Sequence, residues 1–236
     1  MRRKPVANSL KINTMLAFGA VFFSIIFSLL ISGCSSKEDE AREKFQSAAP
    51  EPGWWDDVST EGVTINSFDD LLTYWQNKDR TANQFFKAAY QAILDHPLNE
   101  DIVVNAVSLL PYGDRGYEHT TEMLEFAVNN YFDYKRPLTN YGGKAGDTIG
   151  GIVEKLVKLY NSQNRYSDSI KLINKLISKR ESEINDHMLE LLSSSLAEAY
   201  YNSGNKTKAV GTLNYAIEKY NGSWEQKLRD QLQKYQ

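Results

Sequence analysis

Cysteine, histidine and proline are scarce in this chain of 236 residues, which has one, three and six of them. A single cysteine, Cys34, excludes an internal disulfide. The three histidines, His96, His119 and His187, lie too far apart in the sequence to match a metal-binding spacing such as two histidines four residues apart. The sequence therefore predicts neither a disulfide-stapled scaffold nor a metal centre.

Two longer patterns are also lacking. No segment alternates apolar and polar residues over the length of a strand, which argues against a β-sheet. No segment after Ile31 stays apolar for even half a membrane span. What the chain does have, from Ser67 onward, is a succession of runs with apolar residues three and four apart, separated by Asn, Asp, Gly or Pro. That spacing predicts an all-α domain.

The N-terminus carries the three parts of an export signal. A basic leader contains Arg2, Arg3, Lys4 and Lys11, and no acidic residue occurs before position 38. An apolar run follows from Met15 to Ile31, and the small residues Ser32 and Gly33 precede Cys34. A charged leader, an apolar stretch and small residues before a cut predict a cleaved secretory signal.

The residues Ile31-Ser32-Gly33-Cys34 resemble the lipobox of bacterial lipoproteins, which is an aliphatic residue, two small residues and a cysteine. The resemblance implies cleavage before Cys34, lipidation of this cysteine, and an anchor in the lipid bilayer through its acyl chains. Ser35, where an Asp would retain the protein at the inner membrane, implies the outer membrane. The alternative is an uncleaved anchor, for which Met15–Ile31 is at the low edge of the ~20 residues of a span.

The charge of the mature protein limits its partners. The whole chain has 27 Lys and Arg against 30 Asp and Glu, and the four basic residues of the leader leave 23 cations, or a net charge near −7. Nucleic acid and anionic membrane surfaces repel such a domain. We therefore expect no nucleic acid among its partners.

The chain divides into three parts: a signal peptide over 1–33, a tether over 34–66 and a helical domain over 67–236. The tether is polar and charged up to Phe45 and then carries Pro and Gly. It also holds Trp54 and Trp55, next to two aspartates. Adjacent tryptophans of this kind either pack onto the following domain or stack on a ligand such as a sugar ring.

Helix boundaries in the domain are marked by capping residues and breakers. Ser67, Thr81 and Asn99 each precede an apolar periodic segment and predict helix starts. His96-Pro97 and Pro111 predict helix ends. A further helix is expected from about Tyr117 to Tyr134, a long one from Ser182 to Asn202, and a last one from Ser223 to Tyr235. Together the pattern predicts about nine helices after residue 66.

The last third of the chain contains an internal repeat. Residues 156–177 align with residues 196–217 at an offset of 40 without a gap, with the pairs Leu156/Leu196, Tyr160/Tyr200, Asn164/Gly204, Ser169/Ala209, Ile173/Leu213 and Ile177/Ile217.

The second copy resembles the tetratricopeptide repeat, a pair of antiparallel helices, through Leu196-Ala197, Tyr200, Gly204, Ala209, Leu213 and Ala216. The first copy is degenerate, both copies lack the family's early Trp and late Pro, and the offset exceeds the usual ~34 residues.

This resemblance implies a helical-hairpin solenoid that ends in a C-terminal capping helix. In such a stack the first helix of each hairpin lines a groove. The repeat phase places the following residues there: Glu154, Lys158, Asn161 and Ser162 from the first copy, and Leu191, Ser194, Glu198, Tyr201 and Asn202 from the second. A mixed polar and aromatic face of this kind suits a peptide or helix of another protein, and the alternative is an ordinary solvated helix face.

Sequence signatures of catalysis are weak. The stretch Gly142–Thr148 lacks the spacing of a phosphate-binding loop, and no strand precedes it. The pairs Asp69-Asp70 and Glu100-Asp101 lie at expected helix starts, where negative charge is favourable. We therefore expect no catalytic residue and no cofactor.

The function favoured by the sequence is that of an outer-membrane lipoprotein that binds other envelope proteins as a scaffold. A peptidoglycan- or glycan-active enzyme using carboxylates of the stack is one alternative. A lipoprotein that binds a small ligand or glycan through Trp54, Trp55 and Trp75 is the other.

Overall fold

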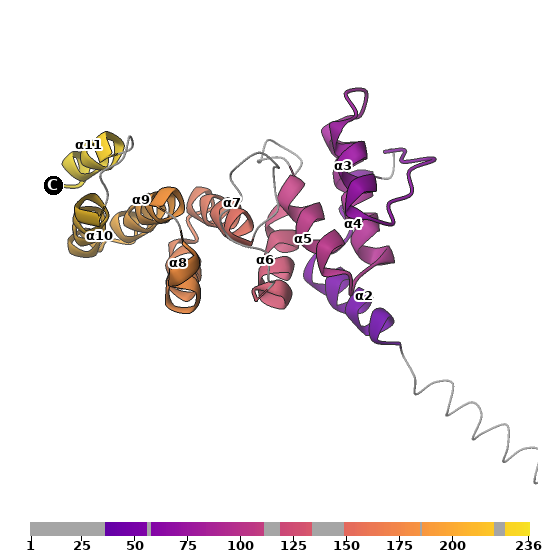
Figure 1. Cartoon of the computed structure of the whole chain (residues 1–236), viewed down its shortest axis with the longest axis horizontal. Helices are drawn as coiled ribbons and strands as arrows, with labels where there is room; N and C mark the ends of the chain where they lie inside the picture. The colour runs from indigo at the N-terminus through magenta and orange to yellow at the C-terminus, as the bar shows by residue number, and fades with distance from the viewer. Residues whose placement is uncertain (1–35, 56–57, 111–118, 134–148, 185, 220–224) are drawn as a thin grey trace, which may run out of the picture. The chain divides into compact units, whose positions relative to one another are not determined.

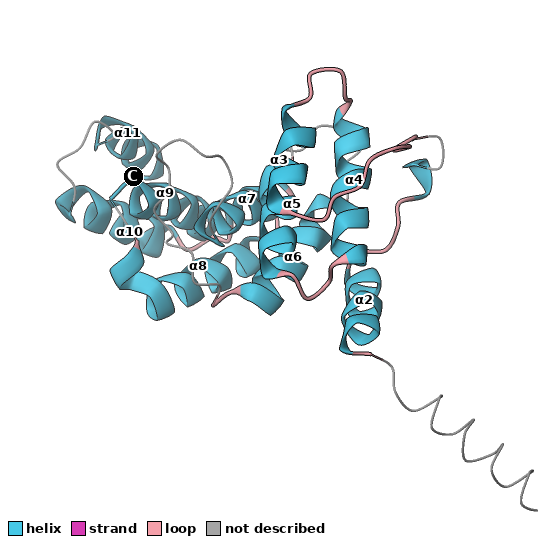
Figure 2. Cartoon of the chain, turned by 45° about the vertical axis from the view of Figure 1, so that its right-hand side comes forward, coloured by secondary structure: helices cyan, strands magenta, loops and turns pink. Residues whose placement is uncertain are grey.

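The computed structural model describes residues 36–55, 58–110, 119–133, 149–184, 186–219 and 225–236, and in these ranges all regular structure is helical (Figures 1 and 2). The predicted all-α class is therefore confirmed. The helices are α2 (Lys37–Ala48), α3 (Phe68–Gln76), α4 (Ala82–Asp95), α5 (Glu100–Leu109), α6 (Thr120–Tyr131), α7 (Ile149–Ser162), α8 (Tyr166–Arg180), α9 (Asp186–Asn202), α10 (Lys206–Lys219) and α11 (Glu225–Tyr235), with short 3₁₀ turns η1 (Gly53–Trp55) and η2 (Glu181–Glu183).

The predicted helix starts at Ser67, Thr81 and Asn99 are N-caps in the structure. The side-chain oxygen of Ser67 accepts a hydrogen bond from the Asp70 amide, and that of Asn99 accepts one from the Ile102 amide. Thr81 and Gln84 form a reciprocal capping box, in which each side chain accepts from the backbone N–H of the other. These bonds satisfy donors at the start of each helix, so local chemistry fixes where these helices begin.

The two copies of the repeat fold as helical hairpins with matching turns. In the first, α7 and α8 are joined through Asn164 at φ 60°, and in the second α9 and α10 are joined through Gly204 at φ 86°. The Arg165 amide donates to the Tyr160 carbonyl, and the equivalent Asn205 amide donates to the Tyr200 carbonyl, at 2.7 Å in both. Both turns use the left-handed region, which Gly and Asn tolerate best.

Helices from α3 to α11 pack in a regular order. Each contacts the next helix in the chain, and each odd-numbered helix also contacts the next odd-numbered one, so that α3, α5, α7, α9 and α11 form one series. The even-numbered helices α4, α6, α8 and α10 each lie against the odd-numbered helices before and after them. Figure 1 shows this progression from α7 to α11.

The buried side chains form two hydrophobic clusters. The main cluster extends from Phe45 to Leu196, with its centre in α4, α5, α6 and α7. A smaller C-terminal cluster holds the second hairpin and α11 together, and consists of Ala197, Ala209, Leu213, Ala216 and Leu228. The three alanines are fully buried, so small side chains let α9 and α10 approach closely.

The compact unit begins at Ala41, whereas the sequence predicts a tether up to residue 66. Phe45 of α2 is fully buried, and its ring lies 4.8 Å from Tyr90 of α4 and 4.9 Å from Phe126 of α6. Tyr90 donates a hydrogen bond to the Ala49 carbonyl at 2.9 Å. Residues 41–49 of the predicted tether thus pack with the domain, through the aromatic contacts of Phe45 and the hydrogen bond from Tyr90 to Ala49.

Within the described ranges no helix combines the length and the apolar character needed to cross a membrane. The predicted signal peptide over 1–33 and Cys34 lie outside these ranges.

Candidate functional site

The predicted groove residues lie along the series of odd-numbered helices, and contacts between the helices join them. Asn161 of α7 donates through Nδ2 to Oε2 of Glu198 at 3.1 Å and to the Ser195 carbonyl at 3.2 Å, both on α9. On α7 itself, Lys158 forms an ion pair with Glu154 at 2.5 Å. These contacts place Asn161 of α7 next to Glu198 of α9.

Several of these residues contribute to packing as well as to a surface. Asn161 is buried, and its Oδ1 accepts a hydrogen bond from the Ser169 hydroxyl at 2.7 Å. Tyr201 stacks on Tyr235 of α11, with ring centroids 4.1 Å apart and planes 9° apart, and is still exposed. Leu191 is half-buried, whereas Glu198, Asn202 and Lys158 are exposed. The exposed part of the predicted groove is thus mainly polar.

The last helix, α11, packs against α9 beside this surface. Gln231 of α11 accepts a hydrogen bond from the Ser194 hydroxyl at 2.8 Å and donates to the Ser194 carbonyl at 3.0 Å. Burial raises the pKa of Tyr235, next to Tyr201 and Glu198. These contacts place α11 beside α9 in the position that the next odd-numbered helix would take.

Of the predicted ligand-stacking residues, Trp55 lies in the core. It is 5% exposed, and its ring meets Tyr90 edge-on at 4.8 Å and Phe86 at 6.0 Å. Its carbonyl accepts a hydrogen bond from Lys87 Nζ at 3.1 Å. Trp55 therefore packs onto the domain, which was the alternative to ligand stacking, while the side chain of Trp54 lies outside the described part of the structure.

Two solvent-facing hollows that the sequence analysis did not predict lie between successive even-numbered helices. The first, the charged hollow, lies between α6 and α8 over α7 and has a volume of about 350 Å³. It is lined by Glu125, Val128, Asn129, Leu156, Tyr160, Arg165, Asp168, Lys171, Leu172 and Lys175.

A network of charges bridges the charged hollow from one wall to the other. Arg165 forms ion pairs with Glu125 of α6 at 2.7 Å and with Asp168 of α8 at 2.9 Å. Its guanidinium also lies over the Tyr160 ring at 4.3 Å. The Tyr160 hydroxyl donates to Glu125 at 2.9 Å. Burial, together with this carboxylate, raises the pKa of Tyr160 well above its usual range, so the hydroxyl stays protonated.

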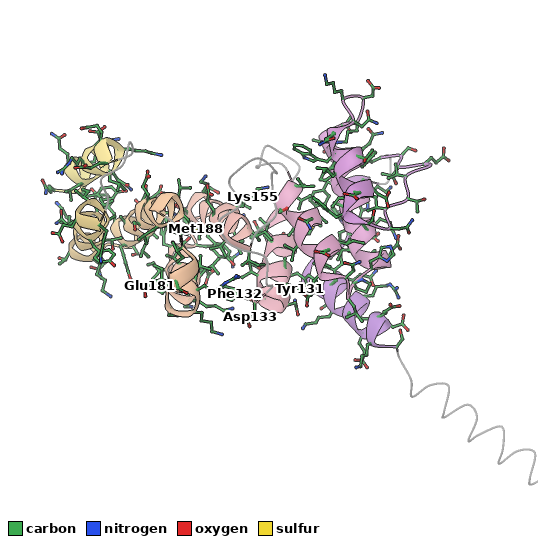
Figure 3. The ribbon with its side chains drawn as sticks, in the orientation of Figure 1. Tyr131, Phe132, Asp133, Lys155, Glu181 and Met188 are labelled. Atoms are coloured by element: carbon green, nitrogen blue, oxygen red, sulfur yellow. The ribbon has the colours of Figure 1, made fainter. Side chains whose placement is uncertain are left out.

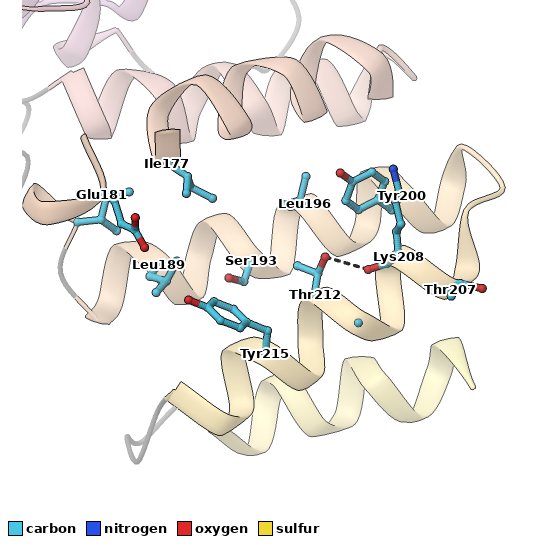
Figure 4. A pocket seen from close by; sticks show the side chains of 12 residues that line it. Ile177, Glu181, Leu189, Ser193, Leu196, Tyr200, Thr207, Lys208, Thr212 and Tyr215 are labelled. Carbon is cyan, nitrogen blue, oxygen red and sulfur yellow. Dashed lines mark hydrogen bonds between the residues drawn. The ribbon is translucent and has the colours of Figure 1, made fainter. Parts of the chain in front are cut away.

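The second hollow, the apolar hollow, lies between α8 and α10 over α9 and has a volume of about 530 Å³. Figure 4 shows its lining, which consists of Ile177, Glu181, Ile184, Leu189, Ser193, Leu196, Tyr200, Thr207, Lys208, Gly211, Thr212 and Tyr215. Its volume falls within the range of about 300–1,000 Å³ that is typical of ligand sites.

The two hollows occupy equivalent places in the repeat. Six pairs of lining residues are separated by the 40-residue offset: Leu156/Leu196, Tyr160/Tyr200, Asp168/Lys208, Lys171/Gly211, Leu172/Thr212 and Lys175/Tyr215. The repeat was the available signal for them, but only the structure, in which α8 packs against α7 and α9, shows that these faces border open space.

A half-buried lysine links α7 to the end of α5. Lys155, labelled in Figure 3, donates through Nζ to the Leu110 carbonyl at 2.8 Å and also to the Ser108 carbonyl. Burial lowers the pKa of this amine to about 8. The nearby Glu154 raises this pKa and Lys158 lowers it, both by less than burial does. A cation that binds the last carbonyls of a helix stabilises its C-terminus, which gives Lys155 a structural role.

The described residues contain no cluster of three or more His, Cys, Asp or Glu side chains that could hold a metal ion. His96 is the C-cap of α4, and His119 precedes the first residue of α6. The stretch Gly142–Thr148 and the side chain of His187 lie outside the part of the chain that the structure describes.

Comparison with known proteins gives no assignment: no protein-family model matches the chain, and neither the curated proteins nor the solved structures contain a match.

Proposed function

We propose that this protein is a lipid-anchored scaffold of the bacterial envelope that binds other envelope proteins through a tetratricopeptide-like stack of helical hairpins. The single observation that carries the proposal is the structural equivalence of the two hairpins. Their turns share the left-handed residue, Asn164 or Gly204, and the 2.7 Å backbone bond that follows it. Repeated hairpins create repeated surfaces, which in stacked-helix proteins commonly bind extended partners.

The contact pattern supports the stack. Contacts between successive odd-numbered helices are what a solenoid requires, because each hairpin buries its apolar face against the next. The helix α11 then acts as the cap, since its Leu228 completes the C-terminal cluster while its exposed face carries Lys227, Asp230 and Lys234.

The proposed anchor is Cys34, and the proposed location is the outer membrane. The support comes from the lipobox-like residues Ile31–Cys34 and from Ser35 after them. Several acyl chains on one cysteine would hold the protein stably, because one chain alone gives only marginal membrane binding.

The anchor is tested by Cys34→Ser in the full chain, expressed in a bacterium and labelled with an alkyne fatty acid. We expect loss of the label and accumulation of the uncleaved form, which its apolar run Met15–Ile31 still holds at the membrane. Ser35→Ala serves as the control and should be labelled and cleaved as the wild type is. Unchanged labelling and cleavage of Cys34→Ser would contradict the anchor.

The scaffold role is tested by affinity capture from envelope extract with the tagged mature protein. The surface variant Lys158→Glu changes the exposed part of the predicted groove, and Lys234→Glu on α11 is a control with the same charge change. We expect a defined set of envelope proteins with the wild type and the control, and a reduced set with Lys158→Glu. Capture of no protein, combined with hydrolysis of peptidoglycan or glycan by the mature protein, would contradict the scaffold role.

A further inference from the structure

The apolar hollow differs from its equivalent in what crosses it. In the charged hollow, Arg165 joins Glu125 on one wall to Asp168 on the other. In the apolar hollow the position of Asp168 is taken by Lys208, and those of Lys171 and Lys175 by Gly211 and Tyr215. No ion pair closes this hollow among the residues that the structure describes. The exchange leaves a larger space with an aliphatic and aromatic lining.

The floor of the apolar hollow is one face of α9. Leu189, Ser193, Leu196 and Tyr200 follow one another at spacings of four, three and four residues, as expected for a single helix face. The predicted groove residues Leu191, Glu198 and Tyr201 lie on the opposite side of the same helix. The apolar hollow is therefore a second surface, distinct from the predicted groove.

The two ends of the hollow carry opposite charges. Figure 4 shows Glu181 at one end, beside Ile177, and Lys208 at the other, beside Tyr200. The Lys208 ammonium lies 5.4 Å from the centroid of the Tyr200 ring. Both charged side chains are exposed, and in the described ranges neither has an oppositely charged partner within ion-pair distance. Lys208 and Glu181 are thus both available to a ligand.

One side of the hollow opens to solvent. Tyr215 is 48% exposed, and Thr207, Lys208 and Gly211 are exposed as well. A ligand bound here would bury one face on Leu189, Leu196 and Tyr200 and keep the other in water. An amphipathic helix has this division of faces, and an apolar groove between helices is a common receptor for one.

We propose that the apolar hollow binds an amphipathic helix of a partner protein. The helix lays its apolar stripe between α8 and α10, with an acidic side chain against Lys208 and a basic side chain against Glu181. This inference rests on the proposed scaffold function and names one docking surface for it. Charge complementarity at the two ends sets the direction of the helix, and burial of its apolar stripe supplies most of the affinity.

Gly211 offers a clean way to fill the hollow. A Cβ atom added there meets nothing within 4 Å, and its backbone is helical. Gly211→Phe therefore has room for its Cβ and adds a ring at a residue that lines the hollow. Gly53 has equally open surroundings outside the hollow, so Gly53→Phe is the matched control. For charge, Lys208→Glu is paired with Lys171→Glu, which lies in the equivalent charged hollow.

The test selects binders from a displayed library of short helical peptides, randomised at apolar and charged positions, against the complete mature protein. We expect selected peptides to share an apolar stripe with acidic residues at one end and basic residues at the other. Gly211→Phe and Lys208→Glu should each weaken their binding about tenfold or more, as loss of a hot spot does. Gly53→Phe and Lys171→Glu should bind as the wild type does. Exchanging the acidic residue of the peptide for Lys should restore binding to Lys208→Glu.

Circular dichroism of each variant verifies its fold before binding is compared. The proposal is overturned if no peptide is selected, if the selected peptides lack the stripe, or if Gly211→Phe binds them as tightly as the control does. It is also overturned if dodecanoate, but no peptide, binds to the hollow. Envelope proteins captured equally by wild type and Gly211→Phe would leave the scaffold function standing and remove only this docking surface.

Discussion

The two hairpins of the repeat share a backbone and differ in how they use polar side chains. In the first, α7–α8, Ser169 and Asn161 form a buried hydrogen bond, and Arg165 bridges the charged hollow. In the second, α9–α10, the equivalent positions are Ala209, Tyr201 and Asn205, so small and aromatic contacts replace the network. The same pair of helices can therefore be held together by polar bridges or by close apolar packing. In the hairpin with apolar packing, the apolar hollow lies open to solvent.

The largest expected effect is a loss of stability when a buried residue is truncated in either of the two clusters that hold the hairpins. Leu213 and its equivalent Ile173 are both fully buried, so Leu213→Ala and Ile173→Ala should each lower the free energy of unfolding by about 2–5 kcal/mol. Ile173 belongs to the main cluster, whereas Leu213 belongs to the small C-terminal one.

Hydrogen exchange should therefore show faster opening confined to α10 and α11 for Leu213→Ala, and a wider response for Ile173→Ala. Equally wide responses would mean that the two hairpins unfold as one unit.

The next effect compares the buried polar bond with its aromatic equivalent. Asn161→Ala removes the 2.7 Å acceptor of the buried Ser169 hydroxyl and leaves it only the Val157 carbonyl at 3.3 Å, so stability should fall by about 1–3 kcal/mol. Tyr201→Ala loses a stacked pair at the surface and should cost less, about 0.5–1.5 kcal/mol beyond the lost area. Urea unfolding measures both.

The double variant Asn161→Leu with Ser169→Ala should recover part of the loss, since no buried polar group then remains unpaired at this bond. Strictly additive losses would contradict the assignment of the bond as the cause.

A pH dependence should distinguish α7 from α9, because position 155 is Lys in the first copy and Ser195 occupies the equivalent position in the second. Burial lowers the pKa of Lys155 to about 8 from 10.5, so between these values the unfolded chain binds more protons than the folded one. Stability should then rise with pH, by about 1–2 kcal/mol from pH 8 to pH 9.5.

Lys155→Met should abolish this rise, and denaturant unfolding at each pH measures it. Above pH 10 the raised pKa values of Tyr90 and Tyr160 act in the opposite sense, because the folded state keeps their protons, so the comparison ends at pH 9.5. If stability still rises with pH in Lys155→Met, a group other than Lys155 causes the rise.

The smallest effect concerns two glycines of the second hairpin. Gly211 lies in α10 in helical conformation with open space around its Cα, so Gly211→Ala should raise stability by about 0.5–1 kcal/mol. Gly204→Ala should lower it by about 1–2 kcal/mol, because φ is +86° there.

Gly204→Asn, which installs the residue of the first turn, should be milder than Gly204→Ala. Thermal unfolding compares the three variants, and an equal loss for Asn and Ala would show that the two turns are not interchangeable.

Helix boundaries were largely predictable, because they depend on neighbours in the sequence. Ser67, Thr81 and Asn99 cap helices through atoms three residues away. Gly204 and Asn164 occupy left-handed turns at the aligned positions. Docking of α2 was not predictable, because the burial of Phe45 depends on Tyr90 and Phe126, which are far away in the chain.

The candidate site was predictable only in part. The repeat phase placed Asn161 and Glu198 on one surface, and they form a hydrogen bond. It could not show that Asn161 is buried, where it accepts a hydrogen bond from Ser169. It also could not show that Tyr201 stacks on Tyr235 of α11. The charged hollow and the apolar hollow were not predicted, because the 40-residue offset of the repeat does not say which helix faces border open space.

The sequence by itself determined the all-helical class, the starts of α3, α4 and α5, and the equivalence of the two hairpins. Each follows from chemistry within a few residues or from a periodic pattern. The burial of Phe45 and Trp55 in the core, and the bridge of Arg165 across one of the two hollows, depend instead on how the helices pack. The physical reason is that burial and enclosed volume belong to sets of side chains that come together only when distant helices pack.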